Sequence, residues 1–440
     1  MNILVLNGSP KGEYSITLQT VNYLMKIHPE HTFDVLDVGH RIKALERDFS
    51  EAEKALKNAE LLLFSYPVYT FIAPYQLHRF IEIIKEKNID LKGKFATQLS
   101  TSKHFYDVTA HRYIQDNCAD MDDILTEKGQ KEAKDFLSFV LFSIENNLYE
   151  KESVINTPAK NIAVTVPEEN NTHKKGDVVI LTNCKDDDVQ LKNMIARFRA
   201  KCTKKTRIVN IKNYPFKGGC LGCFNCAVSG KCIYKDNFDE FLRNDIQKAD
   251  AIIYAFTIKD HSMGASFKLY DDRQFCNGHR TVTMGMPMGY LISGNYSEEY
   301  NLQMIVEGRA QVGSNFLAGV ATDEFSPDSE IDNLAATLEY ALENSYVPPQ
   351  NFYGIGGAKI FRDLIWLMQG MMKADHKFYK AHGQYDFPQK KRGTMIAMYL
   401  VGALASSPKI KAKMGNMMNE GMLMPYKKML EGLDKKKQKK

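Results

Sequence analysis

The sequence has no hydrophobic run long enough to cross a bilayer. Its longest apolar stretch, Thr394 to Ser407, is shorter than the roughly 20 residues that a membrane-spanning helix needs. The N-terminal segment MNILVLNGSP has no basic region, no long apolar core and no small-residue cleavage site, so it does not resemble a secretory signal. We therefore expect a cytoplasmic protein, in which thiols stay reduced and clustered cysteines serve metal or redox chemistry.

The chain also lacks the common nucleotide-binding motifs. Neither the Walker A pattern, G-x4-GK[ST], nor the dinucleotide pattern, G-x-G-x-x-G, occurs in it, which disfavours nucleoside triphosphates and a dinucleotide pyrophosphate as ligands. No nucleic-acid recognition motif is present, so we expect no nucleic-acid partner. The composition, 44% apolar and 25% charged, is typical of globular proteins.

Strand-like and helix-like patterns alternate along the chain. Apolar runs such as Ile3–Leu6 and Leu61–Ser65 predict strands, and segments of helical periodicity separate them. Because the alternation starts again after a polar stretch, and 440 residues exceed the size of most single cores, we expect an α/β protein with two doubly wound, parallel-sheet domains and a helical C-terminal appendage. The expected parts are a first domain at 1–150, a linker at 151–175, a second domain at 176–345 and the appendage at 346–440.

The first strand ends in a turn that suits a phosphate group. Ile3–Leu6 leads into NGSPKGEYSIT (7–17, the first turn), after which the pattern becomes helical. Free backbone N–H groups at a helix N-terminus attract an anion, and hydroxyl groups and a lysine strengthen such a site. An ordinary strand-to-helix turn without a ligand is the alternative. The candidate binding residues are Ser9, Pro10, Lys11, Ser15 and Thr17.

Two further loops should share that edge of the sheet. Leu61–Ser65 runs into an aromatic loop at 67–72, and a fourth strand, Phe95–Ser100, delivers a polar loop. Ligands of doubly wound sheets lie outside the carboxyl ends of the strands, and an aromatic loop beside a phosphate site suits a flat conjugated ring. Packing of the aromatic side chains against the core is the alternative. The candidate residues are Pro67, Val68, Tyr69, Thr70, Phe71, Thr101 and Ser102, with Lys103 beside them.

These motifs carry a family resemblance over residues 1 to about 150. The run Gly8–Lys11, followed by Ser15 and Thr17, and the run Pro67–Tyr69 resemble patterns of the flavodoxin-like, NADPH-dependent FMN reductase superfamily. The resemblance implies bound FMN, with its phosphate on the first turn and its ring against the aromatic loop, where Tyr69 is the best candidate to touch it. It also implies NAD(P)H as a transient electron donor, so that no separate nicotinamide domain is required.

The expected second domain departs from this pattern. Strands are predicted at 177–181, 207–211, 251–256 and 288–292, but the turn after the first of them is TNCKDDDVQ. Its carboxylates at 186–188 would repel a phosphate, and the later loop FTIKDHSMG lacks the Pro-Val-Tyr run. We therefore expect no phosphate-anchored FMN in this domain. Its segment SFKLYDDRQF resembles a helix motif of the same superfamily at Lys268, Asp272 and Arg273.

Four of the eight cysteines lie in one short segment. KGGCLGCFNCAVSGKCIYKDNF (217–238, the cysteine loop) has the spacing C-x2-C-x2-C-x5-C, and its glycines let the backbone fold sharply. Four convergent sulfurs suit a [4Fe–4S] cluster or zinc. The tight spacing is more typical of a cluster than of a zinc ribbon, which pairs two distant knuckles; free thiols or a redox disulfide are the third alternative. The candidate metal ligands are Cys220, Cys223, Cys226 and Cys232.

The position of the cysteine loop adds a second resemblance. It follows the second strand of its domain and is similar, at each of the four cysteines, to the compact cluster motif of iron–sulfur flavoproteins. That resemblance implies a [4Fe–4S] cluster working together with FMN.

Positive charge is concentrated near the C-terminus. From Asn351 onward the sequence has 18 Lys and Arg against 6 Asp and Glu, a net charge of +12; the whole chain carries +5, so residues 1–350 carry −7. The same region holds 11 of the 20 methionines and the only tryptophan, Trp366. We expect it to begin with a loop, NFYGIGGAK, and to continue as helix. Such a helical region can pack on the protein's own body, dock a partner or contact a membrane surface peripherally.

Together these patterns predict a flavin-dependent oxidoreductase. It would move electrons between NAD(P)H or ferredoxin and an acceptor, with small molecules or proteins as donor and acceptor, and it is compatible with a homo-oligomer. Two alternatives stay open. One is a non-enzymatic electron carrier that docks its partners; the other is an NAD(P)H-dependent flavin or quinone reductase whose cysteines are structural or bind zinc. No catalytic acid or base can be named.

Overall fold

The apolar run at the N-terminus forms an interior strand of a five-stranded parallel sheet. In this computed structural model, β1 (Asn2–Asn7) pairs with β2 (Thr32–Leu36) and with β3 (Leu61–Pro67). β4 (Phe95–Thr101) and the two-residue β5 (Leu125–Thr126) complete the order β2-β1-β3-β4-β5. This is the strand order of flavodoxin-like folds.

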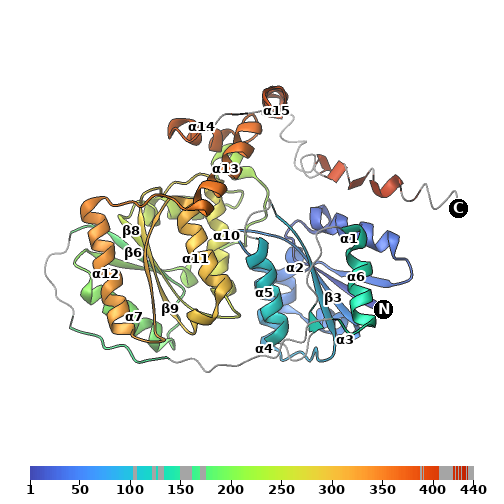
Figure 1. The fold of residues 1–440 in the computed structure, drawn as a ribbon, viewed down its shortest axis with the longest axis horizontal. Helices are drawn as coiled ribbons and strands as arrows, with labels where there is room; N and C mark the ends of the chain where they lie inside the picture. The colour runs from blue at the N-terminus through green and yellow to red at the C-terminus, as the bar shows by residue number, and fades with distance from the viewer. Residues whose placement is uncertain are drawn as a thin grey trace. The chain divides into compact units, whose positions relative to one another are not determined.

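Helices cover both faces of this first sheet (Figure 1). On one face, α1 (Ile16–Ile27) and α6 (Ala133–Glu145) bury Val21, Leu24 and Phe136 against β1 and β3. Because both faces are covered, β1 and β3 are buried along almost their whole length and have nearly continuous apolar sequences. The other helices of the sheet are α2 (Val38–Arg47), α3 (Ser50–Asn58), α4 (Tyr75–Glu86) and α5 (Asp107–Asp120).

The second sheet repeats the strand order of the first. Its order is β10-β9-β8-β6-β7, and every pairing in it is parallel. In order along the chain, its second strand therefore lies at an edge and its first strand lies beside that edge strand, as in the first sheet. The strands are β6 (Val178–Thr182), β7 (Thr206–Asn210), β8 (Ala251–Thr257), β9 (Pro287–Ser293) and β10 (Phe316–Thr322).

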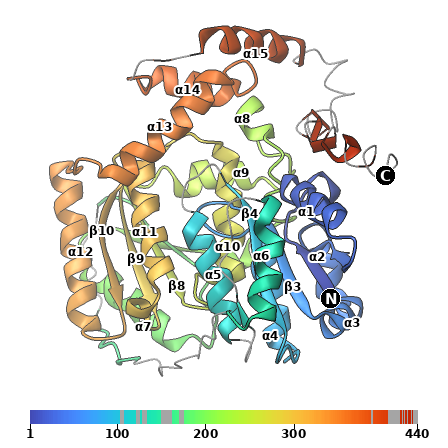
Figure 2. The same cartoon turned by 45° about the vertical axis from the view of Figure 1, so that its right-hand side comes forward.

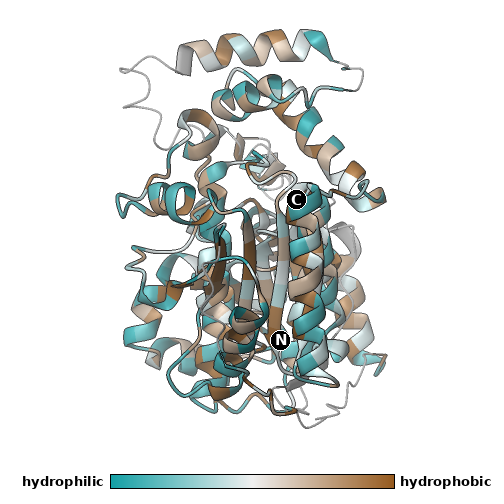
Figure 3. Ribbon diagram, turned by 90° about the vertical axis from the view of Figure 1, so that its left-hand side faces the viewer, coloured by the Kyte–Doolittle hydropathy of each residue, from teal (hydrophilic) through white to brown (hydrophobic). Residues whose placement is uncertain are grey.

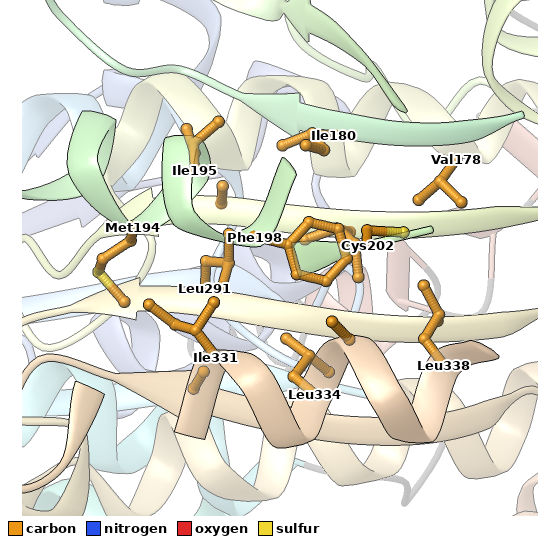
Figure 4. Packing of buried hydrophobic residues seen from close by; sticks show 14 of the residues in the cluster. Val178, Ile180, Met194, Ile195, Phe198, Cys202, Leu291, Ile331, Leu334 and Leu338 are labelled. Carbon is orange, nitrogen blue, oxygen red and sulfur yellow. The ribbon is translucent and has the colours of Figure 1, made fainter. Parts of the chain in front are cut away.

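The core of the second sheet lies between its strands and two long helices. Phe198 and Ile195 of α7 (Val189–Lys201) meet Leu334 of α12 (Pro327–Asn344) over β6, β8 and β9 (Figure 4). α10 (Gly264–Arg273) and α11 (Tyr300–Gly313) also belong to this layered arrangement (Figure 2). Apolar residues run along the central strands (Figure 3), as expected for a sheet that is buried on both faces. The predicted fold class, α/β with parallel sheets and C-terminal helices, is confirmed.

The C-terminal region is helical from its first residues. α13 (Phe352–Leu367), α14 (Lys373–Ala381) and α15 (Arg392–Ala405) follow one another. The predicted loop NFYGIGGAK is wrong, because α13 begins at Phe352, capped by the side chain of Asn351. Gly354 permits this helix, since a Cβ there would lie 2.8 Å from the carbonyl oxygen of Gln311 in α11. The glycine at position 354 therefore serves the close packing of two helices and does not mark the loop that the sequence predicted.

The structure divides into two compact units, each described by itself below. The first comprises Met1–Asn156, Cys220–Gly222 and Ala405–Lys440; the second comprises Thr157–Gly219 and Cys223–Leu404. The described residues are 1–102, 107–120, 125–126, 133–148, 161–168, 175–386, 389, 391–405, 420–421, 423–424, 426–427, 429–432 and 434. Most of the expected linker and Lys103 therefore lie outside them. Within the described residues, no helix is long and apolar enough to cross a membrane.

Candidate functional site

The first turn is held in shape by the side chain of Asn7. Its amide donates to the carbonyl oxygen of Gly12 at 3.1 Å and to Asp37 Oδ1 at 2.7 Å, and its own oxygen accepts from the backbone N–H of Ser9. Gly12 adopts a left-handed φ of 53°, which glycine permits without strain. Gly39 lets the chain pass directly over Ser9, because a Cβ at this position would collide with the Ser9 backbone. The turn is therefore fixed before any ligand binds.

Two serine hydroxyls of this turn are poised to donate to an anion. Ser9 Oγ accepts from the backbone N–H of Lys11, and Ser15 Oγ accepts from that of Leu18 as the N-cap of α1. Both side chains are buried. Since each oxygen is used as an acceptor, its own proton points elsewhere, and the first amides of α1 have no partner within the helix. This set of donors suits a phosphate.

Thr101 connects the first turn to the aromatic loop. Its hydroxyl lies 2.7 Å from that of Thr17, and its carbonyl oxygen accepts from the backbone N–H of Val68 at 3.0 Å. Ser102 follows it at the same edge, and both are half-buried. The structure thus brings the three predicted loops together at the carboxyl ends of β1, β3 and β4.

The aromatic loop is a tight turn with an unusual backbone. Tyr69 and Ile72 exchange two backbone hydrogen bonds, of 2.8 and 3.2 Å, across the intervening pair. That pair, Thr70 and Phe71, has left-handed φ values of 46° and 73°. A β-branched and an aromatic residue rarely adopt this conformation, and such strain is concentrated at functional sites. All five predicted loop residues are half-buried, so the loop does not simply fill the core.

Three residues of the cysteine loop belong to the first unit. Gln76 of α4 donates to the carbonyl oxygen of Cys220 at 3.4 Å, and Gly222 has a left-handed φ of 60°. A Cβ on Gly222 would collide with the hydroxyl oxygen of Tyr69 and would lie 3.5 Å from Cε of Lys11. The stretch Cys220–Gly222 therefore lies against both the aromatic loop and the first turn.

The second unit fills the equivalent anion position with its own carboxylate. Asp188 caps α7 by accepting from the backbone N–H of Leu191, and it accepts from Thr257 Oγ at 2.6 Å. Asp186 and Asp187, which we expected to repel a phosphate as well, are exposed. The carboxylate of Asp188 thus occupies the backbone N–H and hydroxyl donors that would otherwise be available to a phosphate.

The second unit nevertheless keeps the backbone of the aromatic loop. Lys259 and Ser262 exchange two backbone hydrogen bonds, of 2.9 and 3.1 Å, and the residues between them, Asp260 and His261, have φ values of 51° and 57°. His261 Nδ1 lies 2.9 Å from Glu299. The Pro-Val-Tyr run is lost here while the strained turn is retained, so the turn depends on the fold rather than on that run.

Arg273 organises the part of the cysteine loop that belongs to the second unit. Its guanidinium donates to both oxygens of Asp236, at 2.9 and 2.8 Å, to the carbonyl oxygen of Gly218 at 2.8 Å, and to Cys232 Sγ at 3.8 Å. It also lies over the ring of Tyr234, 4.6 Å from the centroid. Although burial raises the pKa of Asp236, the bonds from Arg273 hold it below its usual value. Lys268 and Asp272, the other matched residues, form a buried ion pair at 2.6 Å.

The C-terminal helices cover the short helix that carries Cys226. Ala227 of α8 (Asn225–Ser229) is buried among Ile365, Met372 and Tyr379 of the appendage. Burial raises the pKa of the Cys226 thiol to about 11, and the nearby carboxylate of Asp375 adds to the shift. Asp375 is itself fully buried and accepts from the backbone N–H of His279 at 3.1 Å. The appendage therefore excludes water from one side of the cysteine loop.

Two neighbouring cysteines, Cys223 and Cys232, lie near enough to Cys226 to raise the pKa of its thiol further. All eight cysteines are free thiols. Tetrahedral zinc, with Zn–S distances of about 2.3 Å, places its sulfurs roughly 3.8 Å apart. Within the part of the chain that the structure describes, the Sγ atoms of Cys223, Cys226 and Cys232 are not gathered within 4.8 Å of one another.

Sequence reasoning missed several residues of these sites. Asn7, Asp37 and Gly39 brace the first turn. An asparagine at the end of a strand is a recognisable turn former, so Asn7 had a sequence signal. The others act through contacts between distant segments and had none.

Comparison with known proteins shows which proteins the segment containing the first sheet is similar to. Residues 1–126 match the family described as flavodoxin-like fold. An iron–sulfur flavoprotein from Archaeoglobus fulgidus is 26% identical over 175 residues, which are 37% of this chain and 78% of that protein. An FMN-dependent NADH:quinone oxidoreductase from Pseudomonas syringae pv. tomato is 29% identical over 118 residues, 20% of this chain and 56% of that relative. The flavodoxin-like resemblance predicted from the sequence is thus confirmed, and its named relatives include oxidoreductases.

Among solved structures, an NAD(P)H:quinone oxidoreductase from Methanothermobacter marburgensis aligns with 40% of this chain and with all of its own, at 14% identity and a TM-score of 0.27.

Proposed function

We propose that this protein is an oxidoreductase that holds FMN in its flavodoxin-like first unit and a [4Fe–4S] cluster on its cysteine loop. It would move electrons between NAD(P)H or a reduced ferredoxin and a small-molecule or protein acceptor. The observation that carries the proposal is the link through Thr101 between a turn with phosphate-like donors and a strained aromatic loop. FMN, when bound, supplies the conversion between two-electron and one-electron transfer.

The first turn would bind the phosphate of FMN. Ser9 and Ser15 would donate their hydroxyl protons, the first amides of α1 would donate along the helix axis, and Lys11 would add a positive charge. Thr17 and Thr101 would hold the turn and the polar loop at a fixed distance. Because Asn7 already fixes the turn, little ordering would accompany binding.

The aromatic loop would orient the ring of FMN. Pro67, Val68 and Tyr69 leave β3 at the carboxyl edge, and the strained pair Thr70 and Phe71 turns the chain back. Such a turn places backbone groups and the Tyr69 ring along one side of a flat ligand. The same Tyr69 lies against Gly222, two residues from Cys220.

The cysteine loop would hold the cluster through Cys220, Cys223, Cys226 and Cys232. The tight sequence spacing of the cysteines is more typical of a cluster than of a zinc ribbon, and the relative from A. fulgidus is named an iron–sulfur flavoprotein. Arg273 would fix the loop and place a positive charge beside Cys232, while α13 and α14 would keep water from Cys226. Hydrogen bonding, net charge and burial are the means by which a protein tunes such a cluster.

Steady-state oxidation of NADH and NADPH under argon tests the enzymatic part of this proposal. With FMN bound, we expect turnover when a quinone or another artificial acceptor is present, and loss of most of it in Tyr69→Ala. An electron carrier without its own reductase activity would oxidise neither nicotinamide. Reduction by ferredoxin alone would then assign the carrier function.

A second candidate is a plain flavin or quinone reductase whose cysteines are structural or bind zinc. The name of the relative from P. syringae favours it. The metal content separates the two candidates, because this reductase would turn over NAD(P)H with no iron in the protein.

A further inference from the structure

A second cluster of metal-binding side chains lies far from the cysteine loop in the sequence. His28 caps the C-terminal end of α1, and a tight turn connects it through Pro29 and Glu30 to His31, immediately before β2. The imidazole nitrogens of the two histidines and a carboxylate oxygen of Glu30 all lie within 4.8 Å of one another. Nothing in the proposed redox function uses these residues.

The distances in this cluster match those around a tetrahedral ion. Glu30 Oε1 lies 3.1 Å from His28 Nδ1 and 3.5 Å from His31 Nε2. A zinc ion bound at about 2.0–2.1 Å to nitrogen and oxygen places neighbouring ligand atoms roughly 3.4 Å apart. The three atoms therefore need little movement to bind one ion, and a fourth position would remain for water.

The remaining nitrogen of each ring has a partner that orients it. His28 Nε2 lies 3.5 Å from Ser138 Oγ of α6, and His31 Nδ1 lies 3.2 Å from the N-terminal ammonium of Met1, which donates to it. The contact of His28 with a hydroxyl oxygen is of the kind that metal-binding histidines make through their second ring nitrogen. The Met1 ammonium can only donate, so binding of an ion at His31 Nε2 requires the Met1 amine to give up a proton. The histidine side chains are only 12% and 16% exposed, while the Glu30 side chain, at 57%, faces solvent.

The backbone of the turn is already closed without an ion. The His31 N–H donates to the carbonyl oxygen of His28 at 3.3 Å, and proline at the second position favours such a turn. The next residue, Thr32, donates to the carbonyl oxygen of Met1. The donors are thus held in place by local structure, which reduces the entropy lost on binding.

We propose that His28, Glu30 and His31 form a binding site for a divalent transition-metal ion of the zinc class. Imidazole and carboxylate ligands suit Zn²⁺, Co²⁺ and Ni²⁺. The ion ties the end of α1 to the start of β2, at the edge of the sheet opposite to the first turn. It is separate from the redox cofactors and does not depend on the proposed function.

Calorimetric titration of the full-length, cofactor-loaded protein with Zn²⁺ tests this site. We expect a saturable site that His31→Ala loses, because removal of an outer-shell partner alone costs roughly 10- to 100-fold in metal affinity and loss of a ligand costs at least about 100-fold. Glu30→Gln changes only an exposed side chain and should also weaken binding. His382→Ala is the matched control, since that exposed histidine bonds only to its own helix at Phe378.

Anomalous X-ray scattering at the zinc edge provides the second measurement. The proposal predicts a peak within bonding distance of His28, Glu30 and His31. It is overturned if the wild-type protein binds no zinc outside the cysteine loop, or if His31→Ala and Glu30→Gln bind zinc as tightly as the wild type does. A normal circular dichroism spectrum and a normal unfolding transition show that the variants are folded.

Discussion

The hydroxyl oxygens of Thr17 and Thr101 lie 2.7 Å apart, although 84 residues separate them in the sequence. This hydrogen bond joins the start of α1 to the end of β4. The carbonyl oxygen of Thr101 also accepts from Val68 in the aromatic loop. One residue thus fixes the distance between the part of the site that suits a phosphate and the part that suits a flat ring.

Replacement of Thr17 by valine should weaken FMN binding more than it weakens the fold. Loss of one hydrogen bond costs about 1 kcal/mol of stability, but it also frees the first turn to move relative to the polar loop. We expect FMN affinity, measured by fluorescence quenching, to fall by about 10-fold. Thr20→Val on the same helix is the control and should bind FMN as the wild type does; equal affinities in all three proteins would exclude the proposed coupling.

Gly222→Ala should disturb the aromatic loop through Tyr69. The residue has a left-handed φ, and the added methyl group would collide with the tyrosine hydroxyl. Gly93→Ala is the matched control: Gly93 also has a positive φ, of 74°, but nothing lies within 4 Å of its Cβ position. Gly93→Ala should lower the free energy of unfolding only by the cost of a left-handed backbone conformation for alanine, about 1 kcal/mol. Gly222→Ala should cost more and change the visible circular dichroism of bound FMN.

In the double variant Gly222→Ala, Tyr69→Phe, part of the stability should return, because the colliding hydroxyl is gone. If Gly222→Ala and Gly93→Ala destabilise the protein equally and leave the flavin spectrum unchanged, the packing of Gly222 on Tyr69 is wrong.

Arg273→Met should disrupt the cysteine loop. The substitution leaves Asp236 buried beside two backbone N–H groups but without its cation, and removing one member of a buried ion pair typically costs about 3–5 kcal/mol. Iron bound after anaerobic reconstitution should fall below half of the wild-type amount. Arg207→Met is the control, since Arg207 pairs with Asp177 in a partly exposed position and should lose only about 1 kcal/mol and no iron. Full iron content in Arg273→Met would contradict the role given to this residue.

The same pair predicts opposite pH dependences. In the wild type, Arg273 lowers the pKa of Asp236, so the stability from this group is present above the unfolded value of about 3.9 and is lost as the pH falls through the lower folded value. In Arg273→Met, burial raises the pKa instead, so stability should be lost as the pH rises. Urea denaturation between about pH 2 and about pH 7, in steps of about one pH unit, measures this difference; parallel slopes in the two proteins would refute it.

Sequence patterns predicted the fold well where burial was uniform. The central strands were recognised because both faces are covered, which leaves continuous apolar runs. β10 was missed because it contains Gly319, a register shift and mostly half-buried residues. α13 was mistaken for a loop because of its glycines, one of which, Gly354, serves close packing on α11. Its N-cap, Asn351, is a signal that the composition of the segment concealed.

The candidate site was predictable only in its local parts. The hydroxyls of the first turn and the spacing of the cysteines are sequence patterns that follow from the chemistry of phosphate and metal binding. The strained turn at Asp260 and His261 has no such signal, since its sequence differs from that of the corresponding turn at Thr70 and Phe71 and only the backbone conformation is shared. The turn at His28 was overlooked because three ligands within four residues resemble an ordinary polar turn.

Cofactor analysis of the anaerobically purified protein tests the central claim most directly. FMN, iron, sulfide and zinc should be measured in one sample of wild type and of Cys226→Ser. The account predicts one FMN per chain and about four irons and four sulfides in the wild type. In Cys226→Ser the iron should be largely lost and the FMN retained. A wild-type protein that binds FMN but holds no iron after reconstitution, or one that binds neither, would contradict it.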